Sequence, residues 1–274
     1  MEKRRKVAVV TGGASGIGRA ICNELVQQHV FVIISDINEQ AGKSLEVQLN
    51  KEILCARYVY LDVTEYHSVE RLLINTFEEF GRIDYLFNNA GIAMYSELFD
   101  LTIENWKEIM DVNLWGVING TQVGYKIMKN QGFGHIVNTA SAAGLGPSPI
   151  STAYSTTKHA VVGLTTSLHY EAEEFGVKVS ALCPTFVDTP IFEGSKAINM
   201  NKSDIIKQFE KQKMMSPEKL AKITLKGIHR NLPIICHMPM RRTMDIFFTL
   251  FPAAHKELMR LVCKVSRRAR ILEN

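Results

Sequence analysis

Short runs of β-branched and other apolar residues alternate with amphipathic stretches of helical periodicity from the start of the chain to about residue 183. This alternation is typical of βαβ units, in which crossover helices join parallel strands. Strands are expected at residues 7–10, 30–35, 54–61, 83–87, 135–139, 177–182 and 233–237. Helices are expected at residues 17–28, 39–50, 65–80, 103–129, 153–175 and 217–229.

Right-handed crossovers between such units produce a doubly wound α/β fold of the Rossmann type. The pattern predicts a mostly parallel seven-stranded sheet with helices on both faces. The chain has 274 residues, of which 46% are hydrophobic and 22% are charged, as in ordinary globular proteins. A single domain is therefore expected over residues 1–240, followed by a C-terminal extension at residues 241–274.

The C-terminal extension carries the positive charge of the chain, since residues 241–274 contain eight Lys or Arg against three Asp or Glu. The rest of the chain is neutral, with 24 against 25, which does not indicate nucleic-acid binding. Pro252 and the charged residues that follow it interrupt the apolar run, so the extension is too short to span a bilayer. The pattern fits a basic amphipathic helix in peripheral contact with a membrane surface. It fits equally well a segment that covers the substrate pocket or contacts a second subunit.

The cysteines are spread along the chain and form no C-x-x-C pair. Such spacing indicates neither a metal site nor a disulfide framework. The apolar stretch behind the basic first six residues is also too short for a signal peptide. A reducing, cytoplasmic location is therefore expected. The five cysteines are Cys22, Cys55, Cys183, Cys236 and Cys263.

A glycine-rich run, TGGASGIG at residues 11–18, connects the first strand to the first helix. At such a junction, backbone N–H groups and the helix dipole bind a pyrophosphate. We expect Gly12 to form the tight turn, Gly16 to admit the ligand and Gly18 to let the helix pack on the strand. Ser15 and Ile17 belong to the same site. The run therefore predicts a dinucleotide-binding domain.

Asp36 ends the second expected strand, where a carboxylate accepts hydrogen bonds from ribose hydroxyls and repels a 2′-phosphate. No Lys or Arg occurs at residues 12–18, so the predicted cofactor is NAD. The alternative is that Asp36 caps the helix near Asn38. Asp62 and Val63 follow the third expected strand, and Asp62 is expected to accept from the adenine amino group or to stabilise a turn.

Five ordered motifs over about residues 6–190 resemble the classical short-chain dehydrogenase/reductase family. They are the run at 11–18, the Asn88-Asn89-Ala90-Gly91 segment, Asn113, Ser141, and the Tyr154-Ser155-Thr156-Thr157-Lys158 segment. The resemblance implies a catalytic group of Asn113, Ser141, Tyr154 and Lys158. It also implies cofactor contacts by Asn89, Ala90, Gly91, Tyr154, Lys158, Pro184, Val187 and Thr189, and assembly as a homodimer or homotetramer. The chain departs from the family at Thr185, where a glycine is common.

Tyr154 and Lys158 are four residues apart, so on a helix their side chains share a face. A phenol has a pKa of about 10. A nearby ammonium and the positive nicotinamide should lower the pKa of Tyr154, which then acts as acid and base. Ser141 is expected to hold the substrate oxygen, and Asn113 a water linked to Lys158. No metal is required, and His135, His159 and His169 are interpreted as structural.

The irregular segment at residues 184–216 is long for a loop and is expected to cover the site. Residues 144–150 should supply a mostly apolar wall for an alcohol or ketone substrate that is steroid-like, retinoid-like or long-chain. The predicted wall also includes Met94, Tyr95, Phe186, Ile191 and Phe192. Three alternatives stay open, namely an NADPH-dependent ketone or oxoacyl reductase, a dehydratase or epimerase on the same fold, and a non-catalytic dinucleotide-binding module.

Overall fold

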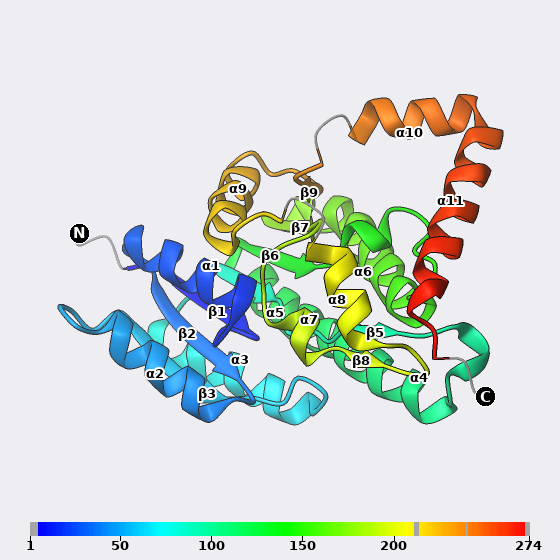
Figure 1. Ribbon diagram of the computed structural model, residues 1–274. Helices are drawn as coiled ribbons and strands as arrows, with labels where there is room; N and C mark the ends of the chain where they lie inside the picture. The colour runs from blue at the N-terminus through cyan, green and yellow to red at the C-terminus, as the bar shows by residue number, and fades with distance from the viewer. Residues whose placement is uncertain (1–4, 211–213, 239–240, 272–274) are drawn as a thin grey trace.

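The sheet has seven strands, all parallel, in the order β3-β2-β1-β4-β6-β7-β9 (Figure 1). The computed structural model describes residues 5–210, 214–238 and 241–271. The doubly wound fold predicted from the sequence is confirmed. The strands are β1 (Val7–Thr11), β2 (Phe31–Asp36), β3 (Ala56–Tyr60), β4 (Tyr85–Asn88), β6 (Gly134–Thr139), β7 (Val177–Cys183) and β9 (Ile234–Cys236).

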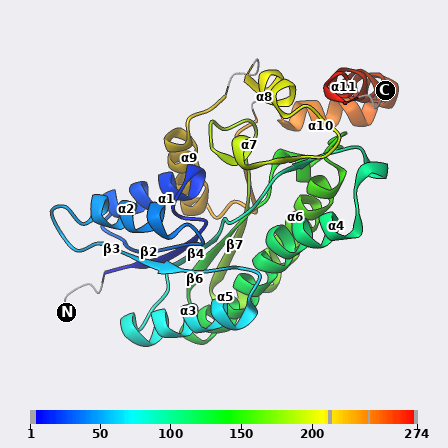
Figure 2. The same ribbon diagram turned by 60° about the horizontal axis from the view of Figure 1, so that its bottom comes forward.

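Helices cover both faces of the sheet (Figure 2). One face carries α1 (Gly16–Gln27), α2 (Glu39–Leu49) and α9 (Pro217–His229), and the other carries α3 (Tyr66–Phe80), α5 (Gly116–Gln131) and α6 (Thr152–Glu171). Strand β1 shows why the sheet needs both layers. Ala8 and Val10 belong to the hydrophobic core under α1 and α9, whereas Val7 and Val9 belong to the core on the opposite face.

The strand order reverses direction between β1 and β4. From β1 the chain winds outward to β2 and β3, and from β4 it winds the other way to β6, β7 and β9. In open parallel sheets, such a reversal leaves a crevice at the carboxyl ends of the strands, where ligands bind. The glycine-rich turn after β1 and the Asn-Asn-Ala-Gly segment after β4 meet at this crevice.

The helix expected at residues 103–129 is divided into three parts. It consists of α4 (Ile103–Met110), a π-helical turn at Asp111–Trp115 and α5. Hydrophobic periodicity does not distinguish a π turn from an α-helix, since the turn inserts only one extra residue. Asn113 lies in this turn and is fully buried.

The segment expected to be an irregular loop also contains regular structure. Residues 184–216 include α7 (Ile191–Gly194), β8 (Lys196–Ala197) and α8 (Lys202–Glu210). Strand β8 pairs in parallel with the short strand β5 (Met94–Tyr95), which forms a separate two-stranded sheet. These elements are too short to give a periodic signal in the sequence.

The C-terminal extension forms two helices, α10 (Arg241–Leu250) and α11 (Pro252–Ser266), and a final 3₁₀ turn, η5 (Arg267–Ala269). Figure 1 shows α11 descending along the edge of the molecule toward the short 3₁₀ turn η1 (Leu98–Asp100), which follows β5. No helix in the described part of the chain is long and apolar enough to cross a membrane.

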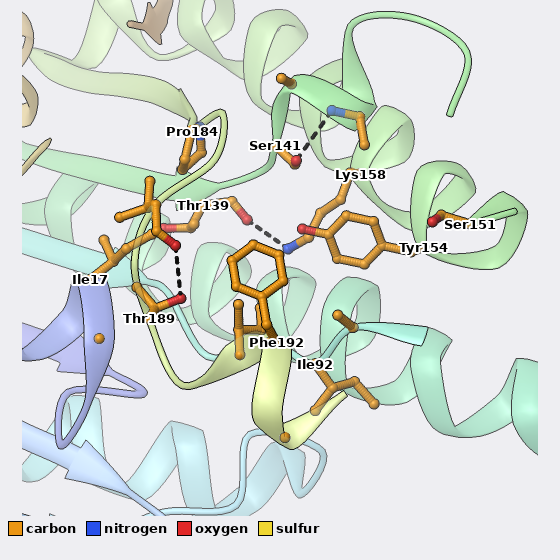
Figure 3. A pocket seen from close by; sticks show the side chains of 18 of the residues that line it. Ile17, Ile92, Thr139, Ser141, Ser151, Tyr154, Lys158, Pro184, Thr189 and Phe192 are labelled. Atoms are coloured by element: carbon orange, nitrogen blue, oxygen red, sulfur yellow. Dashed lines mark hydrogen bonds between the residues drawn. The ribbon is translucent and has the colours of Figure 1, made fainter. Parts of the chain in front are cut away.

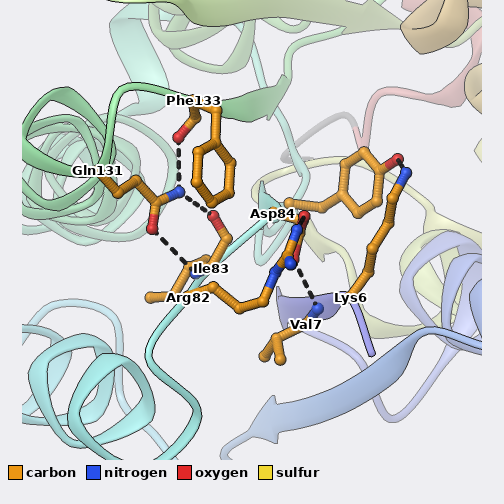
Figure 4. A network of polar contacts seen from close by, with 8 residues as sticks. Lys6, Val7, Arg82, Ile83, Asp84, Gln131 and Phe133 are labelled. Carbon is orange, nitrogen blue, oxygen red and sulfur yellow. Dashed lines mark hydrogen bonds and ion pairs between the residues drawn. The ribbon is translucent and has the colours of Figure 1, made fainter. Parts of the chain in front are cut away.

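A buried carboxylate joins three strands at the opposite, amino-terminal edge of the sheet (Figure 4). Asp84 is 7% exposed, and its Oδ2 accepts hydrogen bonds from the Val7 N–H at 2.9 Å and from Arg82 Nε at 2.8 Å. The Asp84 N–H donates to Val7 O, and its carbonyl accepts from the His135 N–H. The residue therefore fixes the start of β1 and β6 relative to β4.

Asp84→Ala is expected to lower the free energy of unfolding by about 2–3 kcal/mol, because the Val7 N–H and the Arg82 guanidinium lose a buried acceptor. Urea unfolding followed by circular dichroism measures the change. The control is Glu79→Ala, which removes the exposed Arg57–Glu79 pair and should cost less than about 1 kcal/mol. Equal effects of the two substitutions would contradict this role of Asp84.

Candidate active site

A cavity of about 840 Å³ opens at the carboxyl edge of the sheet, where the strand order reverses (Figure 3). Its walls come from the glycine-rich turn, the ends of β2, β4 and β6, the start of α6, the segment after β7, and α11. Most of the predicted site residues line it: Gly12, Ser15, Gly16, Ile17, Asp36, Asp62, Val63, Asn89, Ala90, Gly91, Ser141, Tyr154, Lys158, Pro184, Val187 and Thr189. The cavity lining does not include Gly18 and Asn113.

The glycine-rich turn is held against the segment that follows β4. Gly12 has a φ of +61°, in the left-handed region that favours glycine. A Cβ atom on Gly18 would lie 2.1 Å from the Gly12 carbonyl oxygen, so only glycine lets α1 approach β1 this closely. The Asn89 side-chain amide donates to the carbonyl oxygens of Thr11 and Gly12, each at 3.2 Å. Gly18 thus contributes to the site by packing.

The beginning of α1 presents unpaired backbone N–H groups to the cavity. Ser15 is the N-cap residue, but its side chain forms no capping hydrogen bond, and the first turn contains no acidic residue. Gly16 and Ile17 line the cavity at this point. Free N–H groups at the positive end of a helix dipole fit a diphosphate group.

Asp36 lines the cavity at the end of β2 and accepts two backbone hydrogen bonds. Its Oδ2 accepts from the Ala14 N–H and its Oδ1 from the Asn38 N–H, both at 3.0 Å. The cap of α2 is Asn38 itself, whose side chain accepts from the Ala41 N–H, so Asp36 does not serve as the cap. Among the described residues that line the cavity, Lys158 is the only Lys or Arg. A carboxylate without an adjacent cation fits ribose hydroxyls better than a 2′-phosphate.

Asp62 stabilises a turn, which is one of the two roles that the sequence left open, and its contact with adenine stays a prediction. Its Oδ1 accepts from the Thr64 N–H at 2.9 Å and from the Thr64 hydroxyl at 2.8 Å, which stabilises the turn after β3. The residue also lines the cavity, together with Val63.

Three polar side chains reach the cavity (Figure 3). Tyr154 and Lys158 lie on α6, and Ser141 lies two residues after the end of β6. Lys158 is 3% exposed, and its Nζ donates to the Thr139 carbonyl at 2.9 Å and lies 5.6 Å from the centre of the Tyr154 ring. The Ser141 Oγ accepts from the Ala143 N–H at 3.1 Å, and the Ser141 hydroxyl also forms a hydrogen bond with Tyr154.

Burial dominates the titration of these groups in the protein alone. It raises the pKa of Tyr154, and hydrogen bonding with Ser141 acts in the opposite direction. Burial also lowers the pKa of Lys158 to about 8. The lowered pKa expected for Tyr154 is therefore not a property of the protein by itself, and the phenol is neutral near pH 7.

Asn113 acts on the backbone beside the cavity. Its Oδ1 accepts from the Ile92 N–H at 2.8 Å, and its Nδ2 donates to the Ile92 carbonyl at 2.9 Å. A Cβ on Gly91 would lie 3.1 Å from Asn113 Oδ1 and 3.5 Å from Lys158 Nζ. Asn113 therefore orders the chain next to Lys158, and the water expected there stays a prediction.

The substrate side of the cavity is largely apolar. Of its predicted residues, Tyr95, Pro147, Ser148, Pro149, Ile150, Phe186, Ile191 and Phe192 line it. Met94, Gly144, Leu145 and Gly146 are not among the lining residues. Met94 is 2% exposed and packs in the core with Ile109 and Ala153, because its side chain lies on the opposite side of β5 from that of Tyr95.

The sequence interpretation missed several lining residues, among them Met200, Ile205, Met238, Met259, Val262 and Ser266. The last three of these lie on α11 at helical spacings of three and four. The structure thus places α11 along the cavity. This agrees with the interpretation that the C-terminal extension covers the substrate pocket. Helix α10 meets the start of α11 at a corner, where the Phe248 and His255 rings lie 4.7 Å apart, and it leaves Ile246, Phe247 and Leu250 exposed.

The histidines have other partners. His135 is buried and contacts the Ser180 hydroxyl, and burial lowers its pKa to about 3. His169 Nδ1 contacts the Val179 carbonyl, and His159 Nδ1 contacts the Ser155 carbonyl. Within residues 5–210, 214–238 and 241–271, no three His, Cys, Asp or Glu side chains come together in a group that could hold a metal.

Comparison with known proteins gives the family. A sequence model described as short chain dehydrogenase matches residues 6–199. An uncharacterised oxidoreductase from Staphylococcus epidermidis is 38% identical over 192 residues, which cover 70% of this chain and 82% of the relative. A 3-alpha-(or 20-beta)-hydroxysteroid dehydrogenase from Mycobacterium bovis is 37% identical over 68% of this chain and 70% of its own length.

The fold agrees with solved structures of the same class. A short-chain dehydrogenase/reductase from Burkholderia phymatum, solved in complex with NAD, is 30% identical, covers 89% of this chain and 93% of its own, and has a TM-score of 0.81. Levodione reductase is 26% identical over 86% of this chain and 97% of its own, with a TM-score of 0.77. The chain therefore belongs to the short-chain dehydrogenase/reductase family, a family of oxidoreductases, which confirms the resemblance seen in the sequence.

Lys158→Met is expected to raise the free energy of unfolding at pH 7 by about 2 kcal/mol. The pKa of Lys158 falls from 10.5 to about 8 on folding, so below pH 8 the buried ammonium costs about 3 kcal/mol. Loss of the Thr139 hydrogen bond offsets about 1 kcal/mol of the gain. Since the unfolded chain binds more protons between pH 8 and 10.5, the cost vanishes over that range and the advantage of Met disappears.

Urea unfolding of wild type and variant at pH 7 and pH 10 measures this difference. The exposed Lys126→Met on α5 is the control and should change stability little at either pH. If Lys158→Met is less stable than wild type at pH 7, the contacts of Lys158 stabilise the fold by more than the burial of its charge costs.

Proposed function

We propose that the protein is an NAD-dependent oxidoreductase that interconverts a secondary alcohol and a ketone on an apolar substrate. The observation that carries the proposal is that Ser141, Tyr154 and Lys158 reach the same cavity as the glycine-rich turn and Asp36. One end of the cavity suits a dinucleotide and the other an apolar molecule, with the three polar side chains between them. The family and its NAD-bound member from Burkholderia phymatum support the proposal.

The glycine-rich turn, Asp36, Asp62, Asn89 and the segment at 184–189 would hold NAD, which supplies a hydride acceptor or donor when bound. In alcohol oxidation, Tyr154 would act as the phenolate, whose Oη accepts the hydroxyl proton, and bound NAD would accept the hydride from the carbinol carbon. Ser141 Oγ donates to the substrate oxygen and stabilises its developing charge. In ketone reduction, Tyr154 returns the proton. Its raised pKa in the protein alone keeps the phenol protonated, which is the form needed for reduction.

Lys158 positions the reacting groups in this scheme. Its ammonium is buried beside the Tyr154 ring and is fixed by the Thr139 carbonyl. A positive charge next to a phenol favours the phenolate, so Lys158 would assist proton acceptance by Tyr154 during oxidation. A cytoplasmic location, assembly as a homodimer or homotetramer, and contact of the C-terminal extension with a membrane surface stay predictions.

Three alternatives make different predictions. A dehydratase or epimerase would produce no net change in NADH when given a simple alcohol or ketone. A non-catalytic module would bind the nucleotide without turnover, yet three polar side chains suited to proton transfer and oxyanion binding line the cavity. An NADPH-dependent ketone or oxoacyl reductase would require a cation for the 2′-phosphate, and Asp36 occupies the position where one would be useful.

Asp36 should determine the preference for NADH over NADPH. In wild type, we expect kcat/KM with NADH to exceed kcat/KM with NADPH at least about tenfold. The double substitution Asp36→Ser and Ile37→Arg should reduce this ratio about tenfold, mainly by changing the KM values for the two cofactors. That change corresponds to about 1.4 kcal/mol of binding energy. Steady-state rates with both cofactors measure it, and Glu39→Ser, an exposed carboxylate outside the cavity lining, is the control. A wild type that prefers NADPH would overturn the assignment of NAD.

Tyr154→Phe should lower kcat for any accepted alcohol or ketone by about 10²–10⁴-fold, because it removes the group that transfers the proton. NADH fluorescence over a panel of steroid-like, retinoid-like and long-chain compounds measures turnover, and NADH titration shows whether cofactor binding persists. Tyr170→Phe is the matched control, since Tyr170 lies on the same helix with 68% of its surface exposed. Full activity in Tyr154→Phe would refute the catalytic scheme.

A further inference from the structure

The end of the C-terminal extension is joined to the body by a bidentate ion pair. Arg267 Nε lies 2.6 Å from Glu97 Oε1, and Arg267 Nη2 lies 3.1 Å from Glu97 Oε2. Glu97 is 9% exposed and precedes η1, so it is a nearly buried carboxylate supplied by a segment 170 residues away. The Arg267 guanidinium holds the pKa of Glu97 below its usual range. Bidentate pairs of this kind fix orientation as well as distance.

Further contacts surround this pair. Arg270 lies 3.7 Å from Glu97 and 3.8 Å from Asp100, and its guanidinium stacks 4.5 Å from the centre of the Phe99 ring. An ion pair between exposed side chains contributes little, but a carboxylate that is nine-tenths buried and shared by two guanidinium groups is costly to leave unpaired. We call this group of Glu97, Asp100, Arg267 and Arg270 the latch.

The backbone continues the attachment. Asn201 N–H donates to the Ala269 carbonyl at 2.6 Å, and Ile271 N–H donates to the Asn199 carbonyl at 3.0 Å. Ala269 is 1% exposed and packs in a small core with Ile150, Met200 and Ile205. Those three residues line the cavity. The latch therefore ends in the wall of the candidate active site.

Helix α11 borders the cavity but has little else to pack on. Met259, Val262 and Ser266 lie on one side of the helix and line the cavity, whereas Leu258 and Leu261 are exposed on another side. None of the residues of α11 is fully buried. The position of the helix thus depends on its connection to α10 and on the latch, and its inward side chains are available to an occupant of the cavity.

From this arrangement we infer that α11 is the distal wall of the substrate site, that Met259 and Val262 select for a bulky apolar substrate, and that the latch holds this wall in place. This inference rests on the proposed function, because it assumes that the reacting carbon lies beside Tyr154. A small alcohol would occupy only the space near Tyr154. A large one would also contact α11 and bury side chains that are now only partly covered, which favours its binding.

Substrate preference in steady-state kinetics tests whether α11 forms the distal wall of the substrate site. The measured quantity is the ratio of kcat/KM for a polycyclic ketone to that for a short-chain ketone, with NADH. Val262→Trp fills the distal space and should lower this ratio about tenfold. Glu97→Gln weakens the latch and should lower it by a similar factor, mainly by raising KM for the polycyclic ketone. The matched controls are Leu261→Trp, one position away on the exposed side, and Glu257→Gln, which removes an exposed pair with Arg260.

Hydrogen exchange gives a readout that does not require turnover. In Glu97→Gln, amide exchange of residues 258–271 should be at least about tenfold faster than in wild type, and in Glu257→Gln it should match wild type. In Tyr154→Phe with NAD present, a polycyclic alcohol should slow exchange in 258–266, and a short-chain alcohol should not.

Unchanged exchange in Glu97→Gln, or the absence of slowing by the polycyclic alcohol, would overturn the inference. The inference would also be overturned if Val262→Trp left the specificity ratio unaltered, or if Leu261→Trp lowered the ratio as much as Val262→Trp does. Failure of the proposed function is distinguishable, since no ketone would then be reduced by wild type while the latch would still control exchange of the extension.

Discussion

The candidate active site depends on the contact that joins α6 to the end of β6. The buried ammonium of Lys158 donates to the Thr139 carbonyl. The backbone of the same residue lies against Gly144, where an added Cβ would come within 2.4 Å of the Lys158 carbonyl oxygen. This close approach brings Ser141 and Tyr154 to the same cavity. A charge removed from water at neutral pH destabilises a fold, so the Lys158 ammonium lowers stability in this position.

A buried polar network supports the same region from within the sheet. Asn88 Nδ2 donates to the Thr121 hydroxyl and to Asn138 Oδ1, and Asn138 Nδ2 donates to the Thr165 hydroxyl. The network links β4 and β6 to α5 and α6, the helices behind the site. Hydrogen bonds among buried groups are directional, so they fix the register of these elements more strictly than apolar packing does. The positions of the Asn-Asn-Ala-Gly segment and of Lys158 are thereby coupled.

The sheet and the cofactor side of the site could be predicted from sequence because their determinants are local. A strand followed by a glycine-rich turn and a helix specifies where N–H groups collect, and a carboxylate at the end of the next strand lies at the same edge. Asn113 shows the limit, since the π turn that buries it against Ile92 leaves no periodic signal. The raised pKa of Tyr154 was not predicted either, because it reflects how many apolar groups surround the phenol, and these come from distant segments.

The substrate side was the least predictable because it is assembled from residues that meet only in three dimensions. Tyr95 and Met94 are adjacent in sequence, yet one lines the cavity and the other lies in the core, since side chains alternate along even a two-residue strand. The Glu97–Arg267 pair has no sequence signature, because nothing in either neighbourhood indicates a partner 170 residues away. The family match ends at residue 199, whereas α11 begins at Pro252. The positions proposed for cofactor binding and proton transfer thus lie inside the family match, and the part of the cavity wall that α11 forms lies outside it. Such a division lets the distal wall vary without disturbing the geometry around Tyr154.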